Sequence, residues 1–428
     1  MTAATDTPGT ARVVIVGGGT AGHRLARQLA LHGEREVLLL AEEEHRPYNR
    51  VLLAEVLSGR YPPEVAALAP LPPQVVRRRA RVVRVDREQR RVLCDDGSAV
   101  GYGTLVLATG SNPVLPPLRG LFDESRTGLG RHELPGGVFA FRTMADCADI
   151  DARLPRSRHA VVVGGGLLGV SAARALAARG IPALLAHQGE HLMERHLDAS
   201  AAELLRTHLT GQGVEVHTEC RVRSVLTDGR RVTGVELADG FRLEADLLVL
   251  AVGVRPRTGL AGAARLAVGQ GVLVDDRLRT DDPHIHAVGD CAEHRGVVYG
   301  LAGPALEQAD VLALVLSGQP AEYRGSRLLT RLTLNSATPL DIAAFGRTEP
   351  TGPEDRVVRL ADAGRRTYRK VIVRRTEDGG ERLVGGVLLG DLDTLGTLAH
   401  TWADDQDLVL HPLHLLTDIG TTTGGTSR

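Results

Sequence analysis

Short apolar runs that end in glycine organise the first 300 residues of the chain. The run Val13-Val14-Ile15-Val16 stops at a triple glycine, residues 17–19. Residues 21–32 then carry apolar side chains at helical spacing, and residues 37–41 form a second apolar run. A continuous β-branched run is typical of a strand buried on both faces in a parallel sheet. The order strand, glycine turn, helix, strand therefore predicts a βαβ unit.

The same order of patterns returns at residue 160. An apolar run, a triple glycine, a helical pattern and a second apolar run occupy residues 160–163, 164–166, 167–178 and 183–186. Each copy is followed by one more buried run that stops at glycine, at residues 105–110 and 247–253. We therefore predict an α/β protein with two Rossmann-like dinucleotide-binding domains.

The pattern of apolar and polar residues changes after Leu316. Gly318 and Pro320 mark the boundary, and a region of alternating strands follows. This region predicts a smaller α+β domain. The expected organisation is a first dinucleotide-binding domain in two parts, a second one inserted between them, and the C-terminal domain, at residues 1–115 with 246–318, 116–245 and 319–428.

Composition excludes several classes of function. The 428 residues carry a formal net charge of −1, whereas binding of nucleic acid requires an excess of cationic side chains. The four cysteines form no C-x-x-C pair, and the 16 histidines show no metal-ligand spacing. No apolar run reaches the length of about 18 residues that a membrane-spanning helix needs, and the N-terminus lacks a signal segment. We expect a cytoplasmic protein that binds no metal, nucleic acid or membrane.

The first glycine turn has the spacing Gly17-x-Gly19-x-x-Gly22 between a strand and a helix that Thr20 and Ala21 open. The first glycine permits the tight turn, the second lets a pyrophosphate approach the backbone N–H groups, and the third lets helix and strand pack closely. The partial positive charge of the helix N-terminus favours the phosphates. The alternative is a glycine-rich turn selected for packing alone.

A carboxylate follows the second strand, about 20 residues beyond the glycines, as ribose binding requires. Glu42 closes this strand and is the candidate to accept hydrogen bonds from both ribose hydroxyls, and Glu43 is the rival candidate.

Further motifs occur in a fixed order along the chain. They occupy residues 17–24, 47–53, 108–111, 164–169, 253–256, 298–301, 368–370 and 383–391. In this combination the chain resembles the flavoproteins of the pyridine-nucleotide:disulfide-oxidoreductase fold, the group of glutathione reductase and rubredoxin reductase. The motifs are most similar to the NAD(P)H-oxidising flavoprotein part of the assimilatory nitrite reductase large subunit, and they span nearly the whole chain.

The resemblance implies that FAD binds to the first glycine turn. Asp290, which follows Gly289, would hydrogen-bond the ribityl chain, and Ala108-Thr109-Gly110 would end a strand beside the cofactor. Arg50 would reach the FAD phosphate or the flavin face, and Val82 would hold the adenine through its backbone.

The resemblance also shows what this chain lacks. The cysteines of the iron–sulfur and sirohaem modules have no counterpart here, so we expect that the chain does not reduce nitrite by itself. Residues 52–54 lack the cysteine that peroxide- and disulfide-reducing relatives place beside the flavin, which disfavours thiol chemistry.

The second glycine turn, Gly164-x-Gly166-x-x-Gly169, has the same spacing, but two positions near it differ from the relatives. His187 stands where relatives place an acid for the adenosine ribose, and Ser171 replaces a glutamate near the nicotinamide. Without the strand-end carboxylate a 2′-phosphate is not repelled, so the sequence favours NADPH over NADH. The alternative is a second domain kept only as a structural relic.

We therefore expect an FAD-dependent oxidoreductase that passes a hydride from NAD(P)H to FAD and electrons on to a separate acceptor protein or a small-molecule substrate. No catalytic side chain is assigned, because the cofactors carry the chemistry. The alternative is an FAD oxidase or dehydrogenase that acts directly on a small metabolite. The arginine-rich residues 77–91 are either a solvated strand face or a docking patch for an acidic electron carrier. The oligomeric state is open, with a homodimer as one option.

Overall fold

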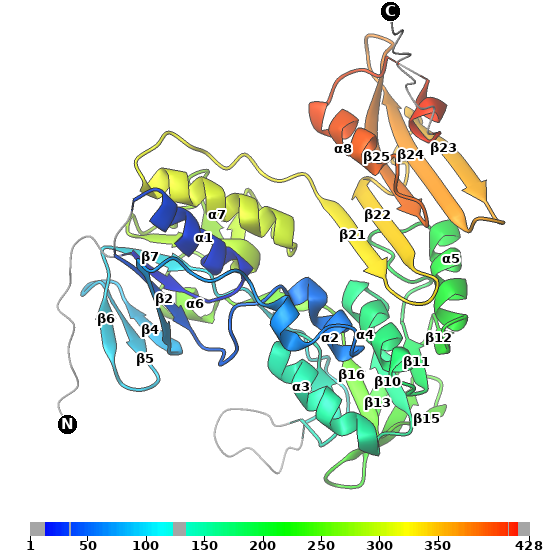
Figure 1. Ribbon diagram of the computed structural model, residues 1–428, viewed down its shortest axis with the longest axis horizontal. Coiled ribbons are helices and arrows are strands. Elements are labelled where there is room, and N and C mark those ends of the chain that lie inside the picture. The colour runs from blue at the N-terminus through cyan, green and yellow to red at the C-terminus, as the bar shows by residue number, and fades with distance from the viewer. Residues whose placement is uncertain (1–12, 34–35, 123–133, 410, 418–428) are drawn as a thin grey trace, which may run out of the picture. The chain divides into compact units, whose positions relative to one another are not determined.

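The computed structural model describes residues 13–33, 36–122, 134–409 and 411–417. These residues group into two compact units (Figure 1). Unit 1 comprises Met1–Leu115, Phe141–Asp149 and Gly253–Leu328, and unit 2 comprises Pro116–Ala140, Ile150–Val252 and Leu329–Arg428. The segments Phe141–Asp149 and 319–328 thus group with unit 1, and the C-terminal region groups with the second glycine turn.

A five-stranded parallel sheet forms the centre of unit 1. Its strands, in spatial order, are β3 (Val75–Arg79), β2 (Val37–Ala41), β1 (Val13–Val16), β7 (Thr104–Leu107) and β19 (Ile285–Ala287). All four residues of β1 are buried, because both faces of the sheet are covered. The helices α1 (Thr20–Leu31) and α7 (Ala302–Leu316) lie side by side on one face (Figure 1). The other face packs against α6 (Gly259–Ala263) and the antiparallel strands β4 (Val82–Asp86), β5 (Arg91–Cys94) and β6 (Ala99–Gly101).

Unit 2 contains a second parallel sheet, in which four strands repeat the order found in unit 1 and the fifth, edge strand precedes the βαβ unit in the chain. It consists of β12 (Val214–His217), β11 (Ala183–Ala186), β10 (Ala160–Val163), β16 (Leu247–Leu250) and β9 (Val138–Ala140). The helices α4 (Leu167–Ala178) and α5 (Ala199–Thr210) and the antiparallel strands β13 (Val222–Thr227), β14 (Val232–Leu237) and β15 (Arg242–Glu244) accompany it. The predicted duplication is confirmed. Each copy also contains a three-stranded antiparallel sheet, β4–β6 in unit 1 and β13–β15 in unit 2.

The C-terminal region of unit 2 forms a five-stranded antiparallel sheet. Its order is β21 (Leu329–Leu334), β22 (Leu340–Gly346), β25 (Glu381–Leu389), β24 (Thr367–Arg375) and β23 (Asp355–Asp362), and α8 (Leu395–Asp404) packs on it. The sequence pattern predicts strands at residues 328–334, 368–373 and 383–389, which correspond to β21, β24 and β25, and it does not predict β22 and β23. β23 is an edge strand with mostly exposed residues, so it carries no alternating apolar signal. Trp402 is partly buried and packs against Phe345 with ring centroids 5.3 Å apart.

The remaining elements are short and connect the sheets. They are α2 (Leu53–Leu57), α3 (Met144–Arg153), β8 (Ser111–Pro113), β17 (Val254–Pro256), β18 (Val272–Val274) and β20 (Ala292–His294). No helix among the described residues has the length and apolar character to cross a membrane.

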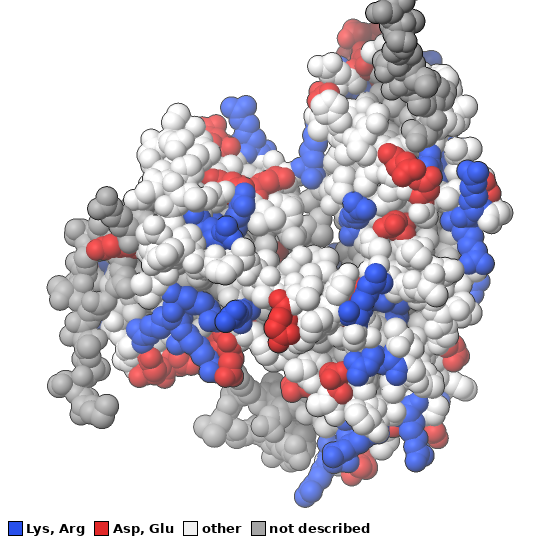
Figure 2. Space-filling model, in the orientation of Figure 1, with Lys and Arg blue, Asp and Glu red and all other residues white. Residues whose placement is uncertain are grey.

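The arginine-rich stretch 77–91 is largely balanced by nearby acids. Arg78 lies 2.7 Å from Asp96, and Arg87 lies 2.7 Å from Asp282. Arg79, Arg81 and Arg91 have ion-pair partners of their own. Cationic and anionic side chains are interspersed on the visible face (Figure 2). This pairing favours the interpretation as a solvated strand face over a strongly basic docking patch.

Candidate functional site

The first glycine turn connects β1 to α1. Gly17 has a φ of +119°, and a Cβ atom there would lie 2.1 Å from the carbonyl oxygen of Ala108. A Cβ atom at Gly22 would lie 2.0 Å from the carbonyl oxygen of Gly17. These two glycines are therefore required by backbone conformation and packing.

Neither backbone conformation nor packing requires a glycine at position 19. Its backbone is extended, and a Cβ atom there would meet nothing within 4 Å. The open space lies at the N-terminus of α1, beside Thr20 and Ala21, where backbone N–H groups are available to an anion. Packing alone thus explains two of the three glycines, and a pyrophosphate at this helix end would account for the third.

Two other strand ends border this turn. Ala108 follows β7 and contacts Gly17, as described above. Gly289 follows β19, has a φ of +78°, and would place a Cβ atom 3.0 Å from the Cβ of Ala21. Carboxyl ends of parallel strands meet at one edge of a sheet, which is where nucleotides bind in such folds. The structure therefore brings Ala108 and Gly289 together with the glycine turn.

Asp290 belongs to a buried polar cluster. Its Oδ2 accepts hydrogen bonds from Ser111 Oγ at 2.9 Å and from Arg142 Nη2 at 2.6 Å. Arg142 also donates to Ser111 Oγ at 2.6 Å. Burial lowers the pKa of the Arg142 guanidinium, and the charge of Asp290 opposes this effect. Among the described residues, no hydrogen bond reaches the other oxygen of Asp290, Oδ1, so it is available to a hydroxyl.

Arg142 is a site residue that the sequence did not reveal. It lies in the short segment Phe141–Asp149, which groups with unit 1 although the residues on both sides of it group with unit 2. Its spacing from Asp290 carries no signal, because the two residues are 148 positions apart. Only the folded chain brings this cation to the carboxylate.

The two rival carboxylates after β2 have different partners. Glu42 forms an ion pair with Arg257, and both side chains are about one-third exposed, 35% and 39%. Glu43 accepts hydrogen bonds from Arg50 Nη2 at 2.5 Å and from Tyr48 Oη at 2.6 Å. Burial is the main cause that raises the pKa of Tyr48, so its hydroxyl stays a donor. Glu43 thus has two internal partners and Glu42 one, and Glu42 is the more exposed of the two carboxylates, which favours Glu42 as the ribose ligand.

The remaining candidates of the first site lie in the same unit. Arg50 donates through Nη1 to the carbonyl oxygen of Arg142 at 2.9 Å, which connects it to the Asp290 cluster. Thr109 Oγ1 donates to the carbonyl oxygen of Arg257 at 2.9 Å, and Gly110 has a φ of +69°. Val82 belongs to the hydrophobic cluster that includes the ends of β1 and β2.

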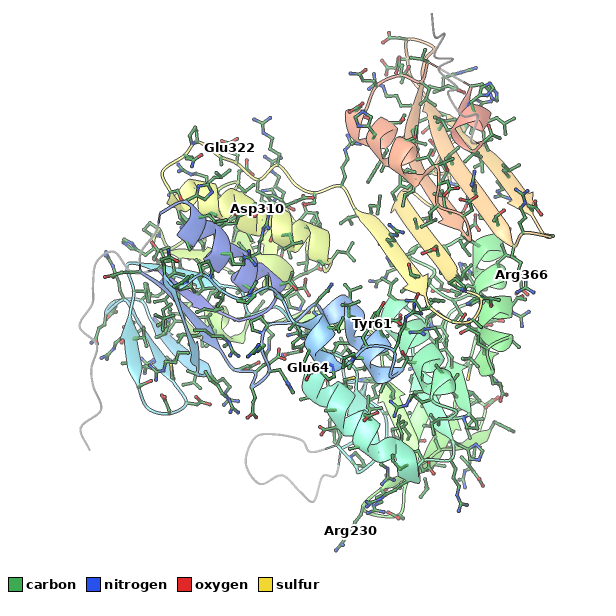
Figure 3. All side chains as sticks on the ribbon, in the orientation of Figure 1. Tyr61, Glu64, Arg230, Asp310, Glu322 and Arg366 are labelled. Atoms are coloured by element: carbon green, nitrogen blue, oxygen red, sulfur yellow. The ribbon has the colours of Figure 1, made fainter. Side chains whose placement is uncertain are left out.

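An ion pair fixes the helix that starts at the first glycine turn. Arg24 of α1 binds Asp310 of α7 through two hydrogen bonds of 2.7 and 2.9 Å, and Asp310 projects from α7 in Figure 3. Gln28 donates to the same carboxylate at 2.8 Å. This bidentate pair, together with Gln28, links α1 to α7 on the same face of the sheet.

The second glycine turn repeats the geometry of the first. Gly164 has a φ of +112°, and its Cβ atom would lie 2.5 Å from the carbonyl oxygen of Ala251. A Cβ atom at Gly169 would lie 1.7 Å from the carbonyl oxygen of Gly164. A Cβ atom at Gly166 would meet nothing within 4 Å. The space for a phosphate is therefore present in both copies, which disfavours a second domain kept as a structural relic.

His187 lies directly after β11, where the sequence placed it. Its Nδ1 accepts a hydrogen bond from the N–H of Gly165 at 3.1 Å. Burial lowers the pKa of His187, while the charge of Glu194 acts in the opposite direction. Ser171 donates to the carbonyl oxygen of Leu167 at 2.7 Å, so its hydroxyl is used within α4.

The described residues contain no thiol or metal centre at these sites. Cys94, Cys147 and Cys291 are buried. Cys291 directly follows Asp290, but burial raises the pKa of its thiol, which keeps it protonated and unreactive. Within the described ranges no three His, Cys, Asp or Glu side chains gather in a way that would hold a metal ion.

Known proteins with similar sequences agree with this geometry. The model of the family described as pyridine nucleotide-disulphide oxidoreductase matches residues 11–309. NAD(P)H nitrite reductase of Bacillus subtilis is 35% identical over 90% of this chain and 46% of the relative. Rubredoxin-NAD(+) reductase of Pseudomonas putida is 31% identical over 72% of this chain and 80% of the relative. These matches confirm the resemblance that the motifs indicated.

A solved structure shows the same architecture. A ferredoxin reductase of Rhodopseudomonas palustris is 28% identical with a TM-score of 0.75, over 89% of this chain and 91% of that chain. The chain spans about half the length of several curated relatives, 46%, 41% and 48% of the first three.

Proposed function

Because the chain belongs to the pyridine nucleotide-disulphide oxidoreductase family, we propose that it is an FAD-dependent enzyme that oxidises NAD(P)H and passes the electrons to a separate acceptor. One observation supports this function above the others. Both glycine turns keep a middle glycine, Gly19 and Gly166, that packing does not require and whose missing side chain leaves room for a ligand. Two dinucleotide sites are what transfer between a nicotinamide and a flavin needs.

The residues of unit 1 bind and orient FAD in this proposal. The N–H groups at the start of α1 bind the pyrophosphate, and Glu42 accepts hydrogen bonds from the adenosine ribose. Asp290 Oδ1 accepts a hydrogen bond from the ribityl chain, while Arg142 and Ser111 hold the other oxygen in place. When bound, FAD supplies the hydride acceptor and the carrier of the electrons. No general base from the chain is needed, because alignment of the two cofactors is sufficient for hydride transfer.

The acceptor is proposed by its class. The relative from Pseudomonas putida is named for rubredoxin, and the structural relative from Rhodopseudomonas palustris is a ferredoxin reductase. We propose a small electron-carrier protein or a partner reductase for this chain. A cytoplasmic location is proposed with it on the sequence argument.

Anaerobic reduction of the flavin tests the proposed function. The purified yellow protein is mixed with NADH or NADPH, and the flavin absorbance is followed. Rapid bleaching by at least one nucleotide is expected. If neither nucleotide bleaches the flavin at millimolar concentration, the reductase is excluded, and direct oxidation of a small metabolite replaces it.

A further inference from the structure

The loop between β11 and α5 brings a carboxylate to the place where the sequence has none. Glu194 Oε2 lies 4.0 Å from Nε2 of His187, the residue that directly follows β11. Glu194 Oε1 accepts a hydrogen bond from the N–H of Glu190 at 2.8 Å. Gly189 gives it room, since a Cβ atom there would lie 2.2 Å from Glu194 Oε1. A carboxylate therefore lies beside the end of β11, although it belongs to a residue seven positions after His187.

The position of Glu194 is fixed relative to the second glycine turn. The preceding residue, Met193, is buried, adopts a φ of +55°, and donates its N–H to the carbonyl oxygen of Gly165 at 2.9 Å. The loop ends at Asp198, the N-cap of α5, which accepts a hydrogen bond from the Ala201 N–H at 2.8 Å. Both ends of this loop are thus anchored.

His187 offers a hydrogen-bond donor beside this carboxylate. Because Nδ1 accepts from the Gly165 N–H, the proton of the neutral ring is on Nε2. The buried Nε2 atom has no hydrogen-bond partner among the described residues. The separation of 4.0 Å from Glu194 is too long for a direct hydrogen bond. Because Nε2 is buried, a ligand oxygen reaches it only when the exposed Glu194 side chain moves aside, and the oxygen would then satisfy both groups.

We propose that His187 and Glu194 together bind the adenosine 2′-hydroxyl of the nicotinamide dinucleotide and select NADH over NADPH. A hydroxyl both accepts from the Nε2–H of His187 and donates to the carboxylate of Glu194. A 2′-phosphate only accepts hydrogen bonds, and its negative charge is repelled by the carboxylate. The preference for NADPH expected from the sequence rested on the absence of a carboxylate here, and with Glu194 in this place we propose the opposite preference. This inference rests on the proposed function.

Binding of nucleotide fragments to the FAD-saturated full-length chain tests the inference without turnover. ADP-ribose and 2′-phospho-ADP-ribose are titrated by calorimetry. For the unmodified chain we expect ADP-ribose to bind at least about tenfold more tightly, because a like charge at this distance is repelled even near the protein surface. Glu194→Gln keeps the size of the side chain and removes the charge, and we expect it to cut this ratio about tenfold. Glu194→Arg should reverse the preference.

A matched control separates the local effect from a general change in charge. Glu203→Gln makes the same substitution on α5 of the same domain, on an exposed carboxylate that pairs with Arg206, and it should leave the ratio unchanged. Equal or tighter binding of the 2′-phosphorylated fragment to the unmodified chain, or an unchanged ratio in Glu194→Gln, would overturn the inference while the nucleotide site stands. If neither fragment binds, the site itself fails, and the proposed function fails with it.

Discussion

At the scale of single residues, the three glycines of each turn have different physical roles. The first and third are fixed by close backbone approach, and the second by the space that a ligand would fill. The sequence does not distinguish these roles, because all three positions are glycine. The distances that a Cβ atom would have in the folded chain separate them.

This difference predicts opposite outcomes for two alanine variants of the second turn. Gly166→Ala should unfold at the same temperature as the unmodified chain but bind ADP-ribose at least about tenfold more weakly, because its methyl group enters the ligand space. Gly169→Ala should lower the thermal midpoint by several degrees, since the new Cβ atom would overlap the carbonyl oxygen of Gly164 and overpacking costs about 1–3 kcal/mol. Thermal scans and calorimetry measure the two effects. A Gly166→Ala variant with normal affinity would contradict the assigned role.

At the scale of elements, the strands and helices of both βαβ units were predictable, and the segment Phe141–Asp149 was not. Buried parallel strands and glycine turns have local signals, which are continuous apolar runs and residues with positive φ. The segment with Arg142 leads into α3, whose apolar residues recur at helical spacing, but this local pattern does not show which unit the segment joins. It contacts unit 1 through the ion pair of Arg142 with Asp290 and through the Met144 N–H, which donates to Tyr48 Oη at 2.9 Å.

Replacing Arg142 tests whether this segment serves the flavin site. Arg142→Met should weaken FAD binding by about tenfold to hundredfold, because a buried hydrogen bond between charged groups contributes about 1.5–3 kcal/mol. The measurement is the FAD dissociation constant from flavin fluorescence, with a thermal scan of the FAD-free protein to verify folding. Arg79→Met, at a position 61% exposed and paired only with Glu44, is the control and should keep normal affinity. Unchanged affinity in Arg142→Met would remove Arg142 from the site.

At the scale of the whole molecule, a buried ion pair within unit 2 connects the C-terminal sheet to the domain that carries the second glycine turn. Lys370 of β24 is fully buried, and its Nζ lies 2.7 Å from Asp198 and 3.2 Å from Glu349. Tyr368 donates its hydroxyl to Asp198 at 2.6 Å. Burial acts to raise the pKa of Asp198, but hydrogen bonds from Lys370, Tyr368 and the Ala201 N–H outweigh it and lower the pKa. The C-terminal sheet thus holds the end of the loop that carries Glu194.

Removal of the lysine should destabilise unit 2 strongly. Lys370→Met leaves Asp198 charged and buried, which costs about 3–5 kcal/mol, and the double variant with Asp198→Asn should recover much of this loss.

Because the folded pKa of Asp198 lies below its ordinary value near 3.9, its contribution to stability is present above that pH and is lost as the pH falls through the folded pKa. Thermal midpoints at pH 7 and pH 3 measure both effects. Arg206→Met on α5 removes an exposed pair and should cost less than about 1 kcal/mol. An equal loss in the single and double variants would contradict the argument.

The sequence by itself determined the two βαβ units, their glycine turns and the family, because a buried strand and a tight turn leave local patterns that a reader of the chain can recognise. It did not determine which distant side chains meet. Arg142 reaches Asp290, Lys370 reaches Asp198, and Glu194 restores the carboxylate that His187 had replaced. Each of these contacts depends on the path of loops and segments in three dimensions, which no spacing records, and the choice of nucleotide depends on one of them.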